Sequence, residues 1–499
     1  MSSRVLLGRA AWAAPSATSA FSRVGVTMPL RAKILSAKPE YRAQMSTVKT
    51  RYAEGEQDVL FSSLYGLRTI ELNRPKKLNS LNLSMIKKIT PRLLEWEKSD
   101  MANVIVMKGA GDKAFCAGGD VAALVEVNAK GGEGVQQSAA YFAEEYALDH
   151  LIATYQTPYI AFMDGITMGG GVGLSAHAPM RIATERTVFA MPETNIGFFP
   201  DVGASFFLPR LDGAIGTYLG LTGETLSGVN VFYTGIATHY MHSTTLPLLE
   251  SRLAELRFND YDSMQERLAH ITTAIEEYTT GLPHDQPILL AGELRQAIDR
   301  CFSHDSVAKI VAALQNEAES GPVREWAQKT LDTLNSRSPT SLHVSLRQLR
   351  IAQKWGIRET FEKEHQLAAK FMASHDFNEG VTARLISKPK RNPNYSPAKI
   401  GDVDVESETF KNFFRPAKDI QRIKFLNKRD FNEYPFTDFG LPREKQVREL
   451  VQSEDLSQRE VISRFVALSK ARLGVKEVVE EIVYRKTVSD AHGRATWVN

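Results

Sequence analysis

Two glycine-rich turns constrain the fold of this chain most, because each lies where a strand-like run gives way to a helical pattern. The first lies in Lys113–Asp120 and reads K-A-F-C-A-G-G-D, and the second lies in Asp164–Leu174 and reads D-G-I-T-M-G-G-G-V-G-L. A short β-branched run, Val104–Lys108, precedes the first turn, and a helical pattern over Val135–Tyr155 follows it. Another run, Pro158–Met163, precedes the second turn. Strands that alternate with helices predict an α/β fold.

Other signals along the chain fit this alternation. Residues 58–73 hold two short apolar stretches joined at Tyr65-Gly66, which predicts a hairpin. Leu83–Lys98 has apolar residues at helical spacing, and Pro91 can kink or split that helix. From about Leu246 to Phe371 the strand signals fade, so we expect a region of amphipathic helices.

The glycine turns also predict a site for a developing negative charge. The first N–H groups of a helix have no partner within the helix, so two such turns converging on one point would offer two donors to an oxyanion. Glycine also lets a substrate come close to the backbone. A third cluster, Phe189–Gly203, places Glu193 and Asp201 on a loop bracketed by prolines. A carboxylate beside an oxyanion hole can act as a general base or as a nucleophile.

Each of these signals has a simpler interpretation when it is taken alone. A glycine cluster is often only a tight turn, and a Pro-Glu pair often only starts a helix. Gly171–Ala176 also imitates a dinucleotide-binding fingerprint, with Glu193 about 20 residues further on. We disfavour that interpretation because these glycines do not directly follow the strand and the first turn would stay unexplained.

Together with Asn73–Leu81 (N-R-P-K-K-L-N-S-L), the three clusters resemble the crotonase (enoyl-CoA hydratase/isomerase) superfamily over roughly Val59–Leu249. The resemblance implies a spiral of ββα units, followed here by a C-terminal helical region. It implies an oxyanion hole from the N–H groups of Gly119 and Gly170. It further implies that the CoA arms lie along the first loop and strand, with contacts from Lys76, Leu78 and Lys113. Solvated lysines and a core leucine remain the alternative for these three residues.

One departure from the family pattern bears on the reaction. Family hydratases carry a glutamate where this chain has Gly173, whereas their second glutamate matches Glu193. Hydration of a C=C bond usually uses two carboxylates, so the loss of one argues against a hydratase or isomerase.

Within the superfamily the chain resembles the 3-hydroxyisobutyryl-CoA hydrolases. The matching segments continue to a point near Lys399, and they are residues 144–146, 191–194, 199–203, 221–223, 235–239 and 376–381. The resemblance implies hydrolysis of 3-hydroxyisobutyryl-CoA, and of 3-hydroxypropionyl-CoA as a further substrate, in valine catabolism. It implies no separate cofactor, because CoA is part of the substrate.

The expected mechanism assigns a role to each site residue. The thioester carbonyl would lie between the N–H groups of Gly119 and Gly170. Glu193 would attack that carbonyl or activate a water, and Asp201 would orient the water or the substrate hydroxyl. Glu145 would accept a hydrogen bond from the 3-hydroxyl and so disfavour acyl groups that lack it. A helix-surface acid is the alternative for Glu145, and a structural loop cap is the alternative for Asp201.

Other catalytic chemistries find less support in the sequence. His239 and His242 lack a third ligand at a recognisable spacing, so we expect no metal. Ser175 does not lie in a nucleophile elbow. Cys116 and Cys301 are far apart, which predicts no disulfide, and Cys116 is expected to be an apolar filler rather than a nucleophile.

The N-terminal segment carries a targeting signal. Residues 1–39 contain no acidic residue, whereas six basic residues are spread among alanines and serines. This composition resembles a mitochondrial transit peptide, expected over residues 1–45, and predicts the mitochondrial matrix. A simple tail is the alternative.

We expect a catalytic core over residues 55–290, a helical region over 291–400 and a charged helical extension over 401–499. In the extension, Ser457–Glu460 forms a capping-box pattern that starts a helix, with Leu468 on its apolar face, Arg472 on its outer face and Gly474 as its expected end. A second helix is expected over Val475–Arg485. This extended form resembles fungal relatives that are components of the mitochondrial small ribosomal subunit, so the extension is a candidate docking surface. A helical appendage packed on the body is the alternative.

The composition bears on possible partners. The net charge of +3 argues against general nucleic-acid binding, and no apolar run predicts a membrane helix. The sequence leaves open whether the protein forms a homo-oligomer.

Overall fold

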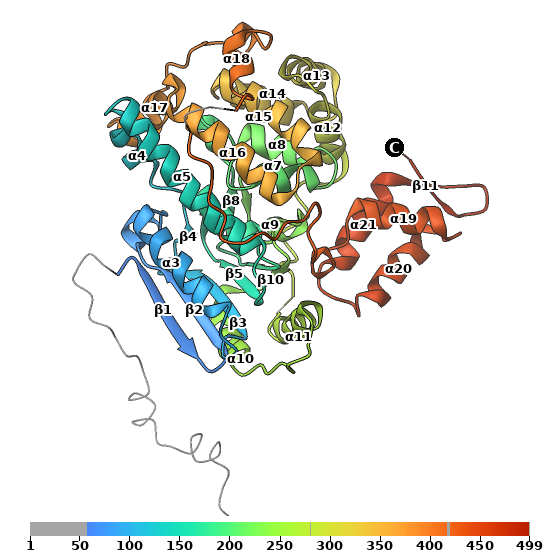
Figure 1. Cartoon of the computed structure of the whole chain (residues 1–499). Helices are drawn as coiled ribbons and strands as arrows, with labels where there is room; N and C mark the ends of the chain where they lie inside the picture. Colours follow the sequence, from blue (N-terminus) through green and yellow to red (C-terminus); the bar gives the residue numbers. More distant parts are fainter. Residues whose placement is uncertain (1–56, 280, 417–419, 499) are drawn as a thin grey trace, which may run out of the picture. The chain divides into compact units, whose positions relative to one another are not determined.

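The computed structural model describes residues 57–279, 281–416 and 420–498, and two sheets carry the strands β1 to β10 of its first half (Figure 1). The six-stranded sheet has the order β1 (Val59–Leu64), β2 (Leu67–Leu72), β3 (Val104–Gly109), β5 (Tyr159–Met163), β7 (Met180–Ala183) and β10 (His239–Tyr240). The four-stranded sheet has the order β4 (Ala114–Cys116), β6 (Ile166–Met168), β8 (Val188–Ala190) and β9 (Leu226–Ser227).

The two sheets are built by one repeated step. The pairs β3/β4, β5/β6 and β7/β8 each give their first strand to the six-stranded sheet and their second to the four-stranded sheet. Successive strands of both sheets pair in parallel within this repeat. The helices after β4, β6 and β8 are α4 (Val121–Asn128), α5 (Gly132–Ala153), α6 (Gly170–Ala176), η2 (Glu193–Ile196) and α7 (Ala204–Phe207). The predicted α/β spiral of ββα units is therefore confirmed.

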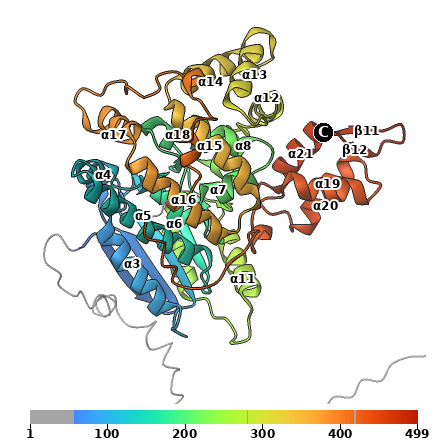
Figure 2. The same ribbon diagram turned by 45° about the horizontal axis from the view of Figure 1, so that its top comes forward.

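Strand β3 shows why the six-stranded sheet lies in the interior. Side chains of a strand alternate between its two faces. Ile105 and Met107 join the main core, which also holds the apolar face of α3 (Leu83–Trp96), seen across the sheet in Figure 2. Val104 and Val106 join a second core with α10 (Leu246–Ala254) and α11 (Met264–Glu276). Because both faces are covered, the strand is a continuous apolar run rather than an alternating one.

The first elements agree with the sequence in type. The predicted hairpin at residues 58–73 is confirmed as β1 and β2, with Tyr65 in the left-handed region at φ 51°. Asn82 caps the start of helix α3, and its side chain accepts from the N–H of Met85. The helix continues through Pro91, so of the two expected effects, a kink or a split, the split does not occur.

The remaining body is helical, as predicted. Its elements are η1 (Pro75–Lys77), η3 (Leu208–Arg210), α8 (Ile215–Thr222), α9 (Val229–Tyr233), η4 (Ser243–Thr245), α12 (Gly292–Phe302), α13 (Val307–Ser320), α14 (Arg324–Asn335), α15 (Pro339–Ile351), η5 (Ala352–Lys354), α16 (Ile357–Met372), α17 (His375–Val381), the π-helical turn η6 (Thr382–Ile386), η7 (Ile400–Asp402), α18 (Glu408–Asn412) and η8 (Thr437–Phe439). Within the described ranges, none of these helices is long and apolar enough to cross a membrane.

The end of the chain is more structured than the sequence predicts. It contains α19 (Glu444–Ser453), α20 (Gln458–Leu468), α21 (Val475–Lys486), β11 (Thr487–Ser489) and β12 (Ala495–Trp497). The capping box of Ser457 and Glu460 is confirmed. The predicted end of this helix at Gly474 is wrong, because Gly474 caps the start of α21 instead. Leu468, expected on the apolar face, is 70% exposed.

Buried charges attach this region to the body. Glu444 on α19 accepts from Arg295 of α12 at 2.5 Å and from Arg485 of α21 at 2.7 Å, and all three side chains are at least 92% buried. Arg472, expected on the outer face, is half-buried and donates to the carbonyls of Phe439 and Gly440. The boundaries at residues 290 and 400, between the core, the helical region and the extension, stay predictions. The expected transit peptide lies outside the described residues.

Candidate active site

The two glycine turns meet. Gly118 and Gly169 have φ of 108° and 44°, a region that only glycine enters readily. A β-carbon added to Gly169 would lie 3.4 Å from the α-carbon of Gly118, and one added to Gly170 would lie 3.4 Å from the nitrogen of Gly119. Gly170 is the first residue of α6, so its N–H has no partner within the helix. The geometry therefore brings the two predicted oxyanion donors, Gly119 and Gly170, together.

Helix α5 carries Glu145 to this point. The Oε1 atom of Glu145 lies 2.6 Å from where a β-carbon of Gly170 would stand, so only glycine fits there. Glu145 is 2% exposed, which does not fit the helix-surface alternative. Tyr141, one turn earlier, donates to the carbonyl of Leu81 at 3.3 Å, and its hydroxyl lies 3.2 Å from a β-carbon added to Gly119.

Glu193 approaches the same turns from the other side. It begins the short helix η2 directly after Pro192. Its Oε1 atom lies 3.3 Å from a β-carbon added to Gly169, and the described residues offer Oε2 no hydrogen bond. The side chain is 5% exposed. A carboxylate with a free oxygen beside a pair of backbone donors is placed to act on a carbonyl bound there.

Asp201 is held by a tyrosine that sequence reasoning did not single out as a ligand. The hydroxyl of Tyr146 on α5 donates to Oδ2 of Asp201 at 2.6 Å. Burial raises the pKa of Asp201 to about 7, although the Tyr146 bond favours the ionised form. Asp201 is thus placed to exchange a proton near neutral pH.

The site gathers five buried carboxyl groups. Glu145, Asp149, Glu193, Asp201 and Glu364 are all at most 5% exposed. Burial, and then mutual repulsion, raise the pKa of Glu145, Asp149 and Glu193 well above the ordinary values. Burial raises the pKa of Glu364 to about 8 against two backbone N–H bonds. Burial and mutual repulsion thus favour the protonated forms of these groups over their ionised forms.

Asp149 explains why position 173 is a glycine. Its carboxyl oxygens lie 2.6 and 2.8 Å from where a β-carbon of Gly173 would stand. The residue is fully buried, and neither oxygen finds a hydrogen bond among the described residues. Neither Asp149 nor Glu364 was predicted as a site residue, because an isolated acid in a helical pattern gives no sign that it points inward.

The three predicted CoA contacts lie around the first glycine turn. Lys76 and Lys113 are exposed, and Leu78 is half-buried. The carbonyl of Leu78 accepts from Ala117 at 3.0 Å, and the carbonyl of Lys113 accepts from Ile166 at 3.0 Å. A cavity of about 630 Å³ opens next to this turn, and its lining includes Asn82, Ser84, Lys87, Asp120, Gln137 and Tyr141. Lys87 and Ser84 are candidate contacts that the sequence motifs did not indicate.

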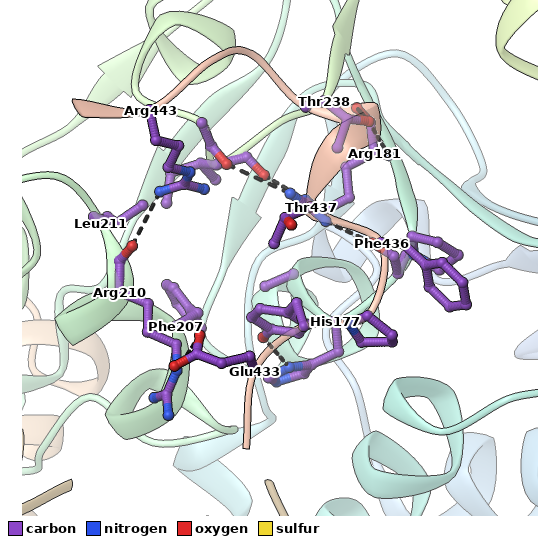
Figure 3. A pocket seen from close by; sticks show the side chains of 18 of the residues that line it. His177, Arg181, Phe207, Arg210, Leu211, Thr238, Glu433, Phe436, Thr437 and Arg443 are labelled. Carbon is purple, nitrogen blue, oxygen red and sulfur yellow. Dashed lines mark hydrogen bonds and ion pairs between the residues drawn. The ribbon is translucent and has the colours of Figure 1, made fainter. Parts of the chain in front are cut away.

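A second pocket, of about 360 Å³, lies away from the carboxyls, where the C-terminal extension packs on the body. Figure 3 shows His177, Arg181, Arg210 and Arg443 around it. Arg181 uses its guanidinium to donate to the carbonyls of Ile236 and Ala178 at 2.6 Å. Arg181 therefore joins two loops beside the pocket by hydrogen bonds to their backbone.

Cysteine, serine and histidine side chains near the site make contacts with the backbone or with neighbouring side chains. Burial raises the pKa of Cys116 to about 12, and its thiol contacts the carbonyl of Gly118. Ser175 donates to the carbonyl of Gly171 at 2.8 Å. His239 is buried beside Thr238, while His242 is exposed near Glu185. Among the described residues no group of His, Cys, Asp and Glu could hold a metal ion.

Two sheets joined by ββα repeats, with two converging glycine turns, define a protein of the crotonase fold. Residues 67–414 match the family model described as Enoyl-CoA hydratase/isomerase, and the chain belongs to this family.

Proteins of more than one kind are similar to this chain. The small ribosomal subunit protein mS47 of Neurospora crassa is 53% identical over 492 residues, which is 97% of each chain. The mitochondrial 3-hydroxyisobutyryl-CoA hydrolase of Gallus gallus is 41% identical over 396 residues, 78% of this chain and 98% of that protein. A carnitinyl-CoA dehydratase from Mycobacterium thermoresistibile has a similar crystal structure, with a TM-score of 0.64 and 33% identity over 74% of this chain and all of that chain.

Proposed function

We propose that this protein hydrolyses 3-hydroxyisobutyryl-CoA to the free 3-hydroxy acid and CoA, in the mitochondrial matrix. The observation that carries the proposal is that Glu145 and Glu193 both lie against the second glycine turn, at Gly169 and Gly170. One acid can then bind the acyl group while the other acts at its carbonyl. The hydrolase relatives support this choice of substrate.

In the proposed reaction the thioester carbonyl accepts hydrogen bonds from Gly119 and Gly170, which stabilise the oxyanion. Glu193 takes a proton from a water that attacks the carbonyl, or attacks it directly to form an anhydride that water then cleaves. The C–S bond breaks and the thiolate leaves as CoA, which takes up a proton. Asp201, ionising near neutral pH, orients the water or the substrate hydroxyl.

Glu145 supplies selectivity in this proposal. Its buried carboxyl lies against Gly170 in the second glycine turn, where the 3-hydroxyl of the acyl group would reach it. An acyl group without that hydroxyl would leave the buried acid unpaired, which costs binding. The cavity beside Lys87 has a volume suited to the pantetheine arm, and Lys76, Leu78 and Lys113 remain candidates for the outer part of CoA.

The test is free-CoA release from 3-hydroxyisobutyryl-CoA by the wild type and by Glu193→Gln. We expect the variant to lose about 10²- to 10⁴-fold in rate. Glu126→Gln, which removes an exposed carboxylate on α4, is the matched control and should keep the wild-type rate. Hydration of crotonyl-CoA is measured in parallel, and none is expected.

A second role in the mitochondrial small ribosomal subunit is favoured by one observation. The similarity to the mS47 protein of Neurospora crassa covers 97% of this chain, so it includes the extension as well as the core. The two roles are compatible, because the carboxyl cluster lies in the core. Deletion of residues 441–499 should abolish co-sedimentation with mitochondrial ribosomal particles. Unchanged sedimentation of this deletion would reject docking through residues 441–499.

A further inference from the structure

A histidine connects the catalytic loop to the C-terminal part of the chain. His177 follows α6 and is 2% exposed. Its Nε2 lies 2.8 Å from the carbonyl oxygen of Val202, and its Nδ1 lies 2.7 Å from the hydroxyl of Tyr434. A carbonyl only accepts, so Nε2 carries the proton and Nδ1 accepts from Tyr434. Burial lowers the pKa of His177 to about 4, so the ring stays neutral and keeps this tautomer.

The loop that His177 contacts has two successive residues in the left-handed region of backbone conformation. Val202, next to Asp201, has φ of 53°, and Gly203 has φ of 83°. A side chain other than glycine in the left-handed region costs about 1–2 kcal/mol, so the surroundings must hold it there. Glu364 on α16 accepts from the N–H groups of Gly203 and Ser205 at 2.6 and 2.9 Å. His177 holds the opposite side through the Val202 carbonyl.

Tyr434 is itself fixed by the core. Its ring meets Phe206 edge-on at 4.9 Å between centroids and also contacts Phe431. The carbonyl of Phe431 accepts from the N–H of Ile357 at 2.9 Å, at the start of α16. The carbonyl of Asn432 accepts from Arg210 at 2.8 Å. The family match ends at residue 414, so this anchored segment lies beyond it.

We propose that His177 and Tyr434 are positioning residues for Asp201, and that the segment around Tyr434 thereby completes the catalytic site. The inference rests on the proposed hydrolase function. Asp201 touches Tyr146 directly, whereas His177 and Tyr434 act on it through the backbone of Val202. Both residues also line the pocket of Figure 3, so the connection is reached from the surface where the extension packs.

The first test compares Tyr434→Phe with Tyr155→Phe. Each removes one hydroxyl that donates a hydrogen bond, and Tyr155 donates to the carbonyl of Leu93 at 2.6 Å, away from the catalytic loop. We expect kcat to fall about 3- to 10-fold in Tyr434→Phe with KM unchanged, as for the loss of one hydrogen bond. Tyr155→Phe should keep the wild-type kcat. His177→Gln, which can still donate to Val202, should retain more activity than His177→Ala.

The second test does not need catalysis. Aspartate carboxyl ¹³C resonances are titrated in the wild type and in Tyr434→Phe, and the Asp201 signal is assigned from Asp201→Asn. The titratable groups facing Asp201 are Tyr141, Glu145, Tyr146 and Asp149 on α5, Glu193 on η2 and Glu364 on α16. A looser loop weakens the Tyr146 bond, so the pKa of Asp201 should move upward in the variant.

The outcomes separate the two proposals. A wild type without hydrolase activity rejects the proposed function, while the Asp201 titration still decides the positioning role. An active wild type with an unchanged kcat and an unchanged Asp201 titration in Tyr434→Phe overturns the positioning role alone. A parallel loss of kcat in Tyr155→Phe would mean that the effect reflects general stability, and it would also overturn the inference.

Discussion

The carboxyl of Asp149 lies against Gly173, with Oδ2 2.6 Å from the place of a β-carbon. The Asp149 side chain is fully buried and packed, so it has little room to move. The space that a side chain at position 173 would need is therefore taken by an acid from α5. The absence of the hydratase glutamate has a steric cause in this chain as well as a catalytic consequence.

We therefore expect Gly173→Ala to destabilise the protein by about 1–3 kcal/mol, as overpacking of a core does. The measurement is urea unfolding followed by fluorescence. Gly132→Ala is the matched control, because a β-carbon added to Gly132 meets nothing within 4 Å. Equal stabilities of Gly173→Ala and Gly132→Ala would contradict the steric role of Asp149.

Removal of the Tyr146 hydroxyl should change the pH dependence of catalysis. The bond from Tyr146 to Asp201 stabilises the ionised carboxylate, so Tyr146→Phe should raise the pKa of Asp201 above its value of about 7. If ionised Asp201 is required, the rising limb of the kcat–pH profile moves to higher pH in the variant. A profile that coincides with that of the wild type would reject this link.

Glu364 should make the protein less stable as the pH rises. Burial raises its folded-state pKa from 4.5 to about 8, so the stability from its protonated form is complete below pH 4.5 and is lost as pH rises through 8. Between pH 6 and 8 the loss is on the order of 2 kcal/mol. Glu364→Gln cannot ionise, so its unfolding free energy should fall less over this range. Glu359→Gln, an exposed site on the same helix, should keep the wild-type slope.

The buried ion pairs of Glu444 should decide whether the extension stays docked. Removing the charge leaves Arg295 and Arg485 buried without this partner, at a cost of about 3–5 kcal/mol. We expect Glu444→Gln to speed proteolytic cleavage between the body and α19. Glu449→Gln, exposed on the same helix, should cleave at the wild-type rate. Equal cleavage rates for the two variants would contradict the role of the pairs.

Much of the core could be predicted from the sequence, because its signals are local. The turn at Gly118 needs glycine for backbone reasons, and the strand at β3 is marked by an unbroken apolar run. The burial of Asp149 and Glu364 could not be predicted, since it depends on which helix faces which after folding. The sequence placed Leu468 on the apolar face of its helix, but Leu468 is the last residue of α20 and is 70% exposed, although Val461 earlier in the helix is buried.

The contacts of the C-terminal segment also could not be predicted from local sequence signals. Tyr434 gives no local signal, and its contact with His177 joins residues that are far apart in the chain. Glu193, in contrast, was predicted as a site residue from the motif around it, and the fold places it at the glycine turns. Its catalytic role stays a prediction.

The most direct measurement is the release of free CoA from 3-hydroxyisobutyryl-CoA by the wild type and by Glu193→Gln, with crotonyl-CoA as the comparison substrate. We expect rapid release by the wild type, loss of release in the variant, and no hydration of crotonyl-CoA. Absence of release by the folded wild type, or equal release by both proteins, would contradict the hydrolase function.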